Sequence, residues 1–146
     1  MKKSSPSGMT IDLPDLKTQK DIVRQDSTNK AIEQLKKNLD APHIEFLGFD
    51  HRRYGDGHLK MESDWTPPSP ELVNAWFEHF KNTFPGYESD KKLGELLGLK
   101  GNADRRIRSF RNGERPIPYG IWRRFLIITG RVYQEIIPVI AIVDDE

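Results

Sequence analysis

Apolar residues at helical spacing concentrate between residues 70 and 131. The fullest stripe has four apolar residues at i, i+3, i+4 and i+7, which lie on one face of a helix: Val73, Trp76, Phe77 and Phe80. Ser69 suits the N-cap of this helix and Pro70 its first position. The aromatic spacing predicts a buried face rather than a platform on which bases stack.

Two short helices are predicted next, joined by a glycine turn. The first carries Leu93, Leu96 and Leu97, is capped by Ser89 or Asp90, and ends at Gly98. The second buries two residues that lie three positions apart, Ile107 and Phe110, and ends at Gly113.

A fourth apolar stripe of this region follows a rigid, proline-rich turn. Its helix begins at Pro118 or Tyr119 and is capped at its C-terminus by Gly130. Its buried face consists of Ile121, Trp122, Phe125 and Leu126. The best domain boundary is the proline-rich connector at residues 66–70, just before this group of helices.

The N-terminal part has weaker patterns. Residues 1–26 are polar and predict a flexible tail, and residues 26–40 predict a helix with a narrow stripe: Ile32, Leu35 and Leu39. Residues 43–64 change to an alternating pattern around Gly55-Asp56-Gly57, which predicts a β-hairpin. We interpret the histidines in this segment, His43, His51 and His58, as surface residues rather than metal ligands.

The most apolar run ends the chain. Residues 136–143 contain one proline, Pro138, and predict a short helix followed by a strand at residues 139–143. So apolar a segment predicts burial, either in the core or across a dimer interface.

Composition narrows the function classes. The 146 residues include no cysteine, which excludes disulfides and thiolate zinc sites, and no apolar run is long enough to span a membrane. No signal peptide is evident, so a cytoplasmic location is the default expectation. No motif of a catalytic nucleophile or a phosphate-binding loop occurs, so we expect no enzyme and no cofactor.

The charge is distributed unevenly, although the net charge is only +1. Residues 101–131 hold eight arginines against two acids, a local net of +6. Residues 132–146 hold four acids and no lysine or arginine. A basic block confined to one motif favours a face that binds a polyanion over a merely solvated helix.

The motif between Leu93 and Gly130 resembles the λ-repressor (Cro/C1-type) helix-turn-helix family. The matching features are Leu93-Gly94-x-x-Leu97-Gly98-Leu99, then Ile107-x-x-Phe110-x-x-Gly113, followed by a proline and a further apolar helix. The resemblance covers roughly residues 70–131. It implies a mainly α fold of four or five helices around a helix-turn-helix, here with an N-terminal extension that includes the hairpin.

One departure from the family concerns the turn. Seven residues, 100–106, separate Leu99 from Ile107, where the family usually has four. The three extra residues either lengthen the turn or add a turn of helix. The two alternatives place different side chains at the front of the second helix.

The resemblance implies sequence-specific binding of double-stranded DNA, most simply as a transcriptional regulator. The helix around residues 102–112 would then read base edges in the major groove. Candidate base-reading or groove residues are Asn102, Arg105, Arg106, Arg108, Ser109 and Arg111. Asp104 is either a helix cap, which we favour, or an acceptor for cytosine.

Phosphate contacts give affinity without sequence information. The candidates for such contacts are Arg115, Arg123 and Arg124, supplemented by Lys91 and Lys92. Arg52, Arg53 and Tyr54 are a secondary candidate for the same role.

The resemblance also implies a homodimer on a two-fold symmetric site, and regulators of this kind are frequent in bacteria and their mobile elements. The expected organisation is a tail (1–26), a helix-plus-hairpin extension (27–66), the helix-turn-helix domain (67–131) and an apolar C-terminal segment (132–146) as a candidate dimer contact. Two alternatives remain. One is a protein adaptor that docks a partner through residues 43–64 or 132–143, and the other is a non-specific nucleic-acid accessory protein.

Overall fold

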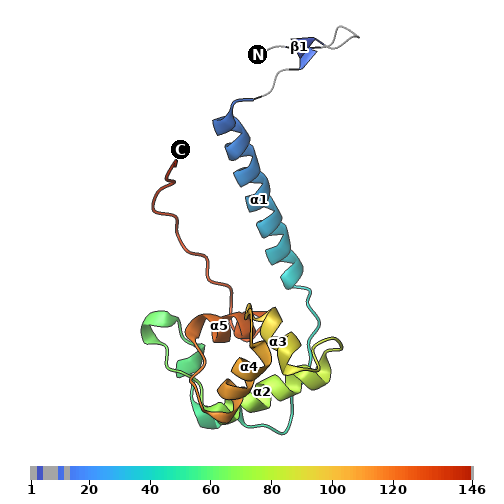
Figure 1. Cartoon of the computed structure of the whole chain (residues 1–146), viewed down its shortest axis with the longest axis vertical. Helices are drawn as coiled ribbons and strands as arrows, with labels where there is room; N and C mark the ends of the chain where they lie inside the picture. The colour runs from blue at the N-terminus through green and yellow to red at the C-terminus, as the bar shows by residue number, and fades with distance from the viewer. Residues whose placement is uncertain (1–2, 5–9, 12–13, 146) are drawn as a thin grey trace. The chain divides into compact units, whose positions relative to one another are not determined.

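The computed structural model describes residues 3–4, 10–11 and 14–145 (Figure 1). The chain divides into two units, residues 1–45 and residues 46–146. The described part of the chain is mainly helical, as predicted. The central and C-terminal helices of the second unit are α2 (Pro70–Thr83), α3 (Asp90–Leu96), α4 (Ala103–Asn112) and α5 (Tyr119–Ile128).

The first unit contains one long helix, α1 (Leu16–Asn38), which begins well before the predicted start at residue 26. Asp15 caps it by accepting a hydrogen bond from the backbone N–H of Thr18 at 2.8 Å. No residue of α1 is buried. A short antiparallel pair, β1 (Lys3–Ser4) with β2 (Thr10–Ile11), precedes the helix, and the rest of the predicted flexible tail before residue 14 lies outside the described residues.

The second unit has one hydrophobic core, and its helices form as the apolar spacing predicts. Ser69 caps α2 and Ser89 caps α3. Figure 1 shows α2, α3, α4 and α5 gathered together, and α4 packs on both α2 and α3. The predicted core face of α2 is confirmed, because its four stripe residues are at most 6% exposed.

Aromatic rings join α2 to α5 at the centre of this core. Trp76 stacks on Trp122 with ring centroids 5.7 Å apart, and Phe77 meets Phe125 edge-to-face at 4.8 Å. These contacts fix α5, which follows the basic helix α4 in the sequence, against α2.

The predicted β-hairpin at residues 43–64 is wrong. The segment contains three short 3-10 helices instead of strands: His51–Tyr54, Gly57–Leu59 and Glu62–Asp64. The segment packs on the core instead of pairing with itself. His58, predicted at the surface, is 2% exposed, and its Nδ1 accepts a hydrogen bond from Trp122 Nε1 at 3.2 Å.

The close packing of this segment also involves Gly57. A Cβ atom on Gly57 would lie 2.2 Å from Thr66 Oγ1, so the chain returns too tightly for a side chain at this position. The backbone N–H of Thr66 in turn donates to the Gly57 carbonyl at 3.2 Å. The segment is thus closed by a hydrogen bond between Gly57 and Thr66 and not by the paired strands of a hairpin.

The C-terminal segment forms neither the predicted helix nor the predicted strand, and residues 133–145 are irregular. Their large apolar side chains are exposed by 53% to 101%, so the predicted burial in the core is wrong. The segment is anchored near its start, where Glu135 pairs with Arg123 at 3.1 Å and accepts a hydrogen bond from the Tyr119 hydroxyl.

Candidate nucleic-acid interface

The two helices α3 and α4 approach closely because Gly94 has no side chain. A Cβ atom there would lie 3.1 Å from Ile107 Cγ1, tighter than ordinary van der Waals contact. Gly98 ends α3 in the left-handed region at φ 90°, and the N–H of Leu99 donates to the Gly94 carbonyl at 2.9 Å. The sequence thus sets both the spacing of the two helices and the point at which the chain turns.

The seven residues between Leu99 and Ile107 are divided between the turn and α4. The helix α4 begins at Ala103, so residues 100–102 belong to the turn and residues 103–106 to the first turn of the helix. Gly101 and Asn102 both adopt positive φ, 73° and 52°. Asn102 is the N-cap residue, although its side chain makes no capping hydrogen bond.

Asp104 is therefore not the N-cap, which was the role we favoured for it. It lies in the first turn of α4, where a negative charge interacts favourably with the helix dipole. Its carboxylate also pairs with Arg108 at 3.6 Å, and both side chains are largely exposed.

The exposed face of α4 is a ridge of polar residues. Arg105, Arg108 and Asn112 follow one another at i, i+3 and i+7 and are all exposed. They lie opposite the buried stripe of the same helix, which is formed by Ala103, Ile107 and Phe110. Arg106 is exposed beside this ridge, and Asn102 is exposed at the start of the helix.

Ser109 is not available for reading bases. It is 7% exposed, and its hydroxyl donates to the Arg106 carbonyl at 2.8 Å. The prediction that Ser109 faces the groove is therefore wrong, because this position faces the interior of the unit.

Arg111 is also withdrawn from the exposed face. Its guanidinium donates to Asn74 at 2.8 Å and to Asp90 at 2.7 Å, and it pairs with Glu78. Lys81 joins the same cluster through Asp90 at 3.0 Å. The side chain of Arg111 ties α4 to α2 and α3, so its predicted role on DNA is wrong.

Arg123 serves the fold as well. It is 8% exposed, donates to the Leu59 carbonyl at 3.0 Å, and pairs with Glu135. A phosphate has no access to a side chain held in this way. We therefore correct the prediction that Arg123 clamps a phosphate.

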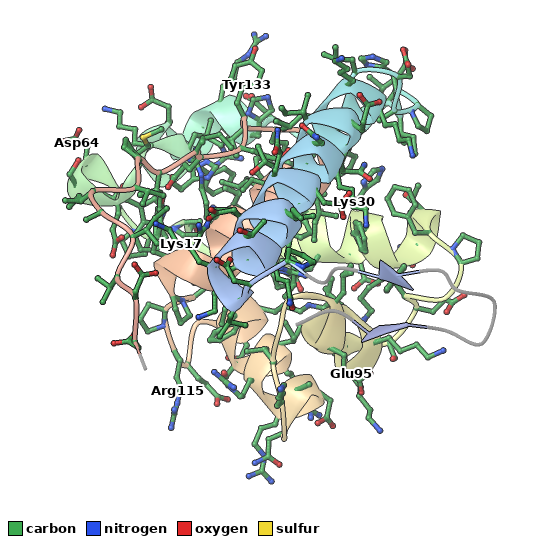
Figure 2. All side chains as sticks on the ribbon, turned by 90° about the horizontal axis from the view of Figure 1, so that it is seen from above. Lys17, Lys30, Asp64, Glu95, Arg115 and Tyr133 are labelled. Atoms are coloured by element: carbon green, nitrogen blue, oxygen red, sulfur yellow. The ribbon has the colours of Figure 1, made fainter. Side chains whose placement is uncertain are left out.

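The remaining predicted cations lie at the surface. Arg115 is exposed in the loop between α4 and α5, and Figure 2 shows its side chain projecting away from the ribbon. Arg124 is exposed on α5, and its Nε donates to the Leu96 carbonyl at the end of α3 at 2.9 Å. Lys91 and Lys92 are exposed in the first turn of α3.

Lys100 is a basic residue of this surface that the sequence analysis did not select. It is exposed in the turn between α3 and α4. Its position between the two short helices was the available signal. Together the exposed cations of α3 and α4, of the loops that follow them, and of α5 form the basic surface: Lys91, Lys92, Lys100, Arg105, Arg106, Arg108, Arg115 and Arg124.

The three residues proposed as a secondary phosphate contact, Arg52, Arg53 and Tyr54, differ in their surroundings. Arg52 and Arg53 are exposed, whereas the Tyr54 hydroxyl donates to Glu71 at 2.7 Å. That bond raises the pKa of Tyr54 above its usual value. The tyrosine is thus occupied by a contact to α2.

The described residues contain neither a cluster of metal ligands nor a helix that could span a membrane. No group of three or more histidine, aspartate and glutamate side chains is placed to hold a metal ion. None of the described helices combines the length and apolarity needed to cross a bilayer. Comparison of the chain with protein-family models, curated proteins and solved structures found no match.

Proposed function

We propose that this protein binds double-stranded DNA in a sequence-specific manner, with α4 in the major groove, and regulates transcription. The observation that carries the proposal is the division of the charged residues of α4. Arg105 and Arg108 form an exposed ridge opposite the core, whereas the guanidinium of Arg111 is hydrogen-bonded to residues of neighbouring helices. The cations that face solvent are those that a groove can reach.

The chemistry of the ridge fits base edges. An arginine guanidinium can donate two hydrogen bonds to guanine O6 and N7, and an asparagine amide can bond adenine N6 and N7. Arg105 and Arg108 are the proposed guanine readers, with Asn102 at the start of α4. Lys91, Lys92, Arg115 and Arg124 are the proposed phosphate contacts, because they lie on α3, α5 and the connecting loop.

We further propose that two copies pair through their C-terminal segments and that the resulting dimer binds a two-fold symmetric DNA site. Residues 139–143 are rich in β-branched side chains, are exposed, and make no backbone hydrogen bond within the described chain. An extended segment of this kind gains backbone partners by pairing with an antiparallel copy of itself. Half-sites would then lie about 34 Å apart, one turn of DNA.

Selection from a random duplex library tests the proposal. The full chain should enrich one two-fold symmetric sequence, bound about 10³-fold or more tightly than scrambled DNA. Measuring both affinities at two salt concentrations separates specific contacts from counterion release. Steep salt dependence without enrichment would instead identify a non-specific nucleic-acid binder.

A protein-adaptor function is the second candidate, and the exposed apolar side chains of residues 136–143 favour it. Sedimentation of the full chain and of a chain ending at residue 135 shows whether the C-terminal segment pairs with a second copy or with a different protein. A dimer that becomes monomeric on truncation supports self-pairing. A monomer in both cases, together with no DNA binding, would favour a different protein partner.

A further inference from the structure

A cavity of about 200 Å³ opens in the second unit, and none of its lining residues belongs to α3 or α4. Its walls come from the segment before α2, from α2 itself and from Arg131, three residues after the end of α5. The lining residues are Phe46, Phe49, His51, Leu59, Trp76 and Arg131. The cavity is therefore aromatic and apolar, with a single permanently charged side chain.

The aromatic walls of the cavity are held in place by their own packing. Phe46 stacks on Phe49 with an interplanar angle of 5° and on His79 with centroids 4.0 Å apart. Trp76 is 4% exposed and is stacked on Trp122 from α5. A flat ligand would meet surfaces that are already ordered, which reduces the entropy lost on binding.

Arg131 is fixed at the other side of the cavity. Its backbone N–H donates to the Leu126 carbonyl at 2.9 Å, in the turn that ends α5. Its guanidinium carbon lies 3.9 Å from the centroid of the Trp76 ring, a cation–π contact. Burial lowers the pKa of Arg131 to about 10, so the side chain remains charged at neutral pH.

The donors of Arg131 have no acceptor in the described part of the chain. No carboxylate there lies within 4.0 Å of the guanidinium, in contrast to the partly buried Arg111 and Arg123. Stacking on a ring uses the face of the guanidinium and leaves the N–H donors in its plane free. The guanidinium nitrogens of Arg131 are not among the buried side-chain atoms that lack a partner, so they reach the opening of the cavity, where an anion would accept charge-assisted hydrogen bonds from them.

We propose that this cavity binds a small organic carboxylate with a flat apolar body, which lies between the aromatic walls and accepts hydrogen bonds from Arg131. The size is adequate, because a cavity of roughly 150 Å³ in another protein holds benzene. The proposal does not depend on DNA binding, since the cavity and the basic surface share no residue.

Benzoate is the probe, and benzamide is its neutral control of the same shape. In heteronuclear NMR of the full chain, benzoate should shift the Arg131 Nε–H and Trp76 Nε1–H signals, with a Kd on the order of 1 mM for so small a ligand. Benzamide should bind at least about tenfold more weakly, because it lacks the charge that Arg131 recognises.

Three variants of the full chain locate the site. Arg131→Gln should abolish the benzoate shifts, and Arg131→Lys should weaken binding about tenfold because lysine loses the paired donor geometry. Arg106→Gln is the matched control on the basic surface and should leave benzoate affinity unchanged. Leu59→Phe keeps Arg131 but narrows the cavity, so it should also weaken binding if Arg131→Gln fails to fold.

Three results would overturn the proposal. Benzoate and benzamide differ in charge but not in shape, so equal affinities would exclude recognition by Arg131. Shifts confined to α4 would indicate that benzoate binds only the basic surface. Unchanged affinity in both Arg131→Gln and Leu59→Phe would place benzoate outside the cavity. None of these results bears on whether α4 binds DNA.

Discussion

Gly94 of α3 and Ala103 of α4 face each other so closely that a Cβ atom on Gly94 would lie 2.9 Å from the Cβ of Ala103. The second neighbour of that atom, Ile107, is fully buried and cannot move aside into solvent. The spacing of α3 and α4 therefore depends on a missing side chain.

Gly94→Ala should lower the free energy of unfolding by about 1–3 kcal/mol, because the added methyl group overpacks the contact between α3 and α4. Denaturation in urea measures the change. Gly120→Ala is the matched control, since a Cβ atom on Gly120 meets nothing within 4 Å and lies within α5. The control should be neutral or stabilising by up to about 1 kcal/mol. Equal losses in both variants would contradict the close approach.

Arg105→Ala and Arg108→Ala should each weaken binding to the selected DNA site by about 1–3 kcal/mol and relax preference at one base pair. Arg115→Ala should weaken all sequences alike and reduce the salt dependence, as expected for a lost phosphate contact. Arg24→Ala, an exposed arginine of α1, is the control without an expected effect. Fluorescence anisotropy against single-base variants of the site measures all four. Equal and sequence-blind losses at Arg105, Arg108 and Arg115 would show that α4 does not read bases.

Arg111→Met should lower the free energy of unfolding by about 2 kcal/mol, because it removes the contacts of Arg111 with Asp90 and Glu78 and leaves Lys81 as the only cation of the cluster. The Arg111 side chain is 17% exposed, so solvent compensates little for the lost contacts. The matched change on the same helix is Arg108→Met, whose ion pair is exposed by 62% and 59% and should contribute under about 1 kcal/mol. Thermal and urea unfolding compare the two. A larger loss at Arg108 would contradict the assignment of Arg111 to the fold.

Stability should fall as the pH drops below about 6.5, and His58 should account for part of the fall. Burial, followed by the nearby charges of His51 and Arg131, lowers the pKa of His58 below its usual 6.5. The unfolded chain therefore binds a proton more tightly than the folded protein does. The stabilising contribution of neutral His58 is complete above about pH 6.5. It is lost as the pH falls from there to the pKa of His58 in the folded protein, by at most about 1.4 kcal/mol per pH unit.

Urea unfolding of the wild type and of His58→Gln at several pH values measures this effect. Glutamine retains an acceptor for Trp122 but does not titrate, so the variant should show a shallower loss of stability at acidic pH. Parallel pH profiles for the two proteins would assign the acid sensitivity to other groups.

The four α-helices of the second unit were predictable because each places apolar residues at helical spacing, and Ser69 and Ser89 cap two of them. The stripe from Val73 to Phe80 and the pair Ile107 and Phe110 are local signals that the core merely completes. The sequence does not predict the early start of α1, because residues 16–26 have no apolar stripe. Its cap at Asp15 and its internal ion pairs, such as Lys30 with Asp26 at 2.9 Å, sustain it instead.

The roles of the arginines were harder to predict, because a helix pattern does not show which carboxylates a neighbouring helix presents. Arg111 follows Ile107 by four positions, which places it near the buried stripe, but Asp90 and Glu78 come from α3 and α2. Arg123 depends on partners still farther apart, Leu59 and Glu135. The alternating pattern at residues 43–64 failed for the same reason, since the contact of His58 with Trp122 spans 64 positions.

The absence of buried residues in α1 has a consequence for how the chain melts. A helix of 23 residues without a buried face loses its turns gradually on heating, from the ends inward. The unit that contains α2 to α5 has a common core and should unfold in one cooperative step. Ellipticity at the helical wavelength should thus decline steadily before the sharp transition, and amide protons of α1 should exchange with solvent long before those of α2.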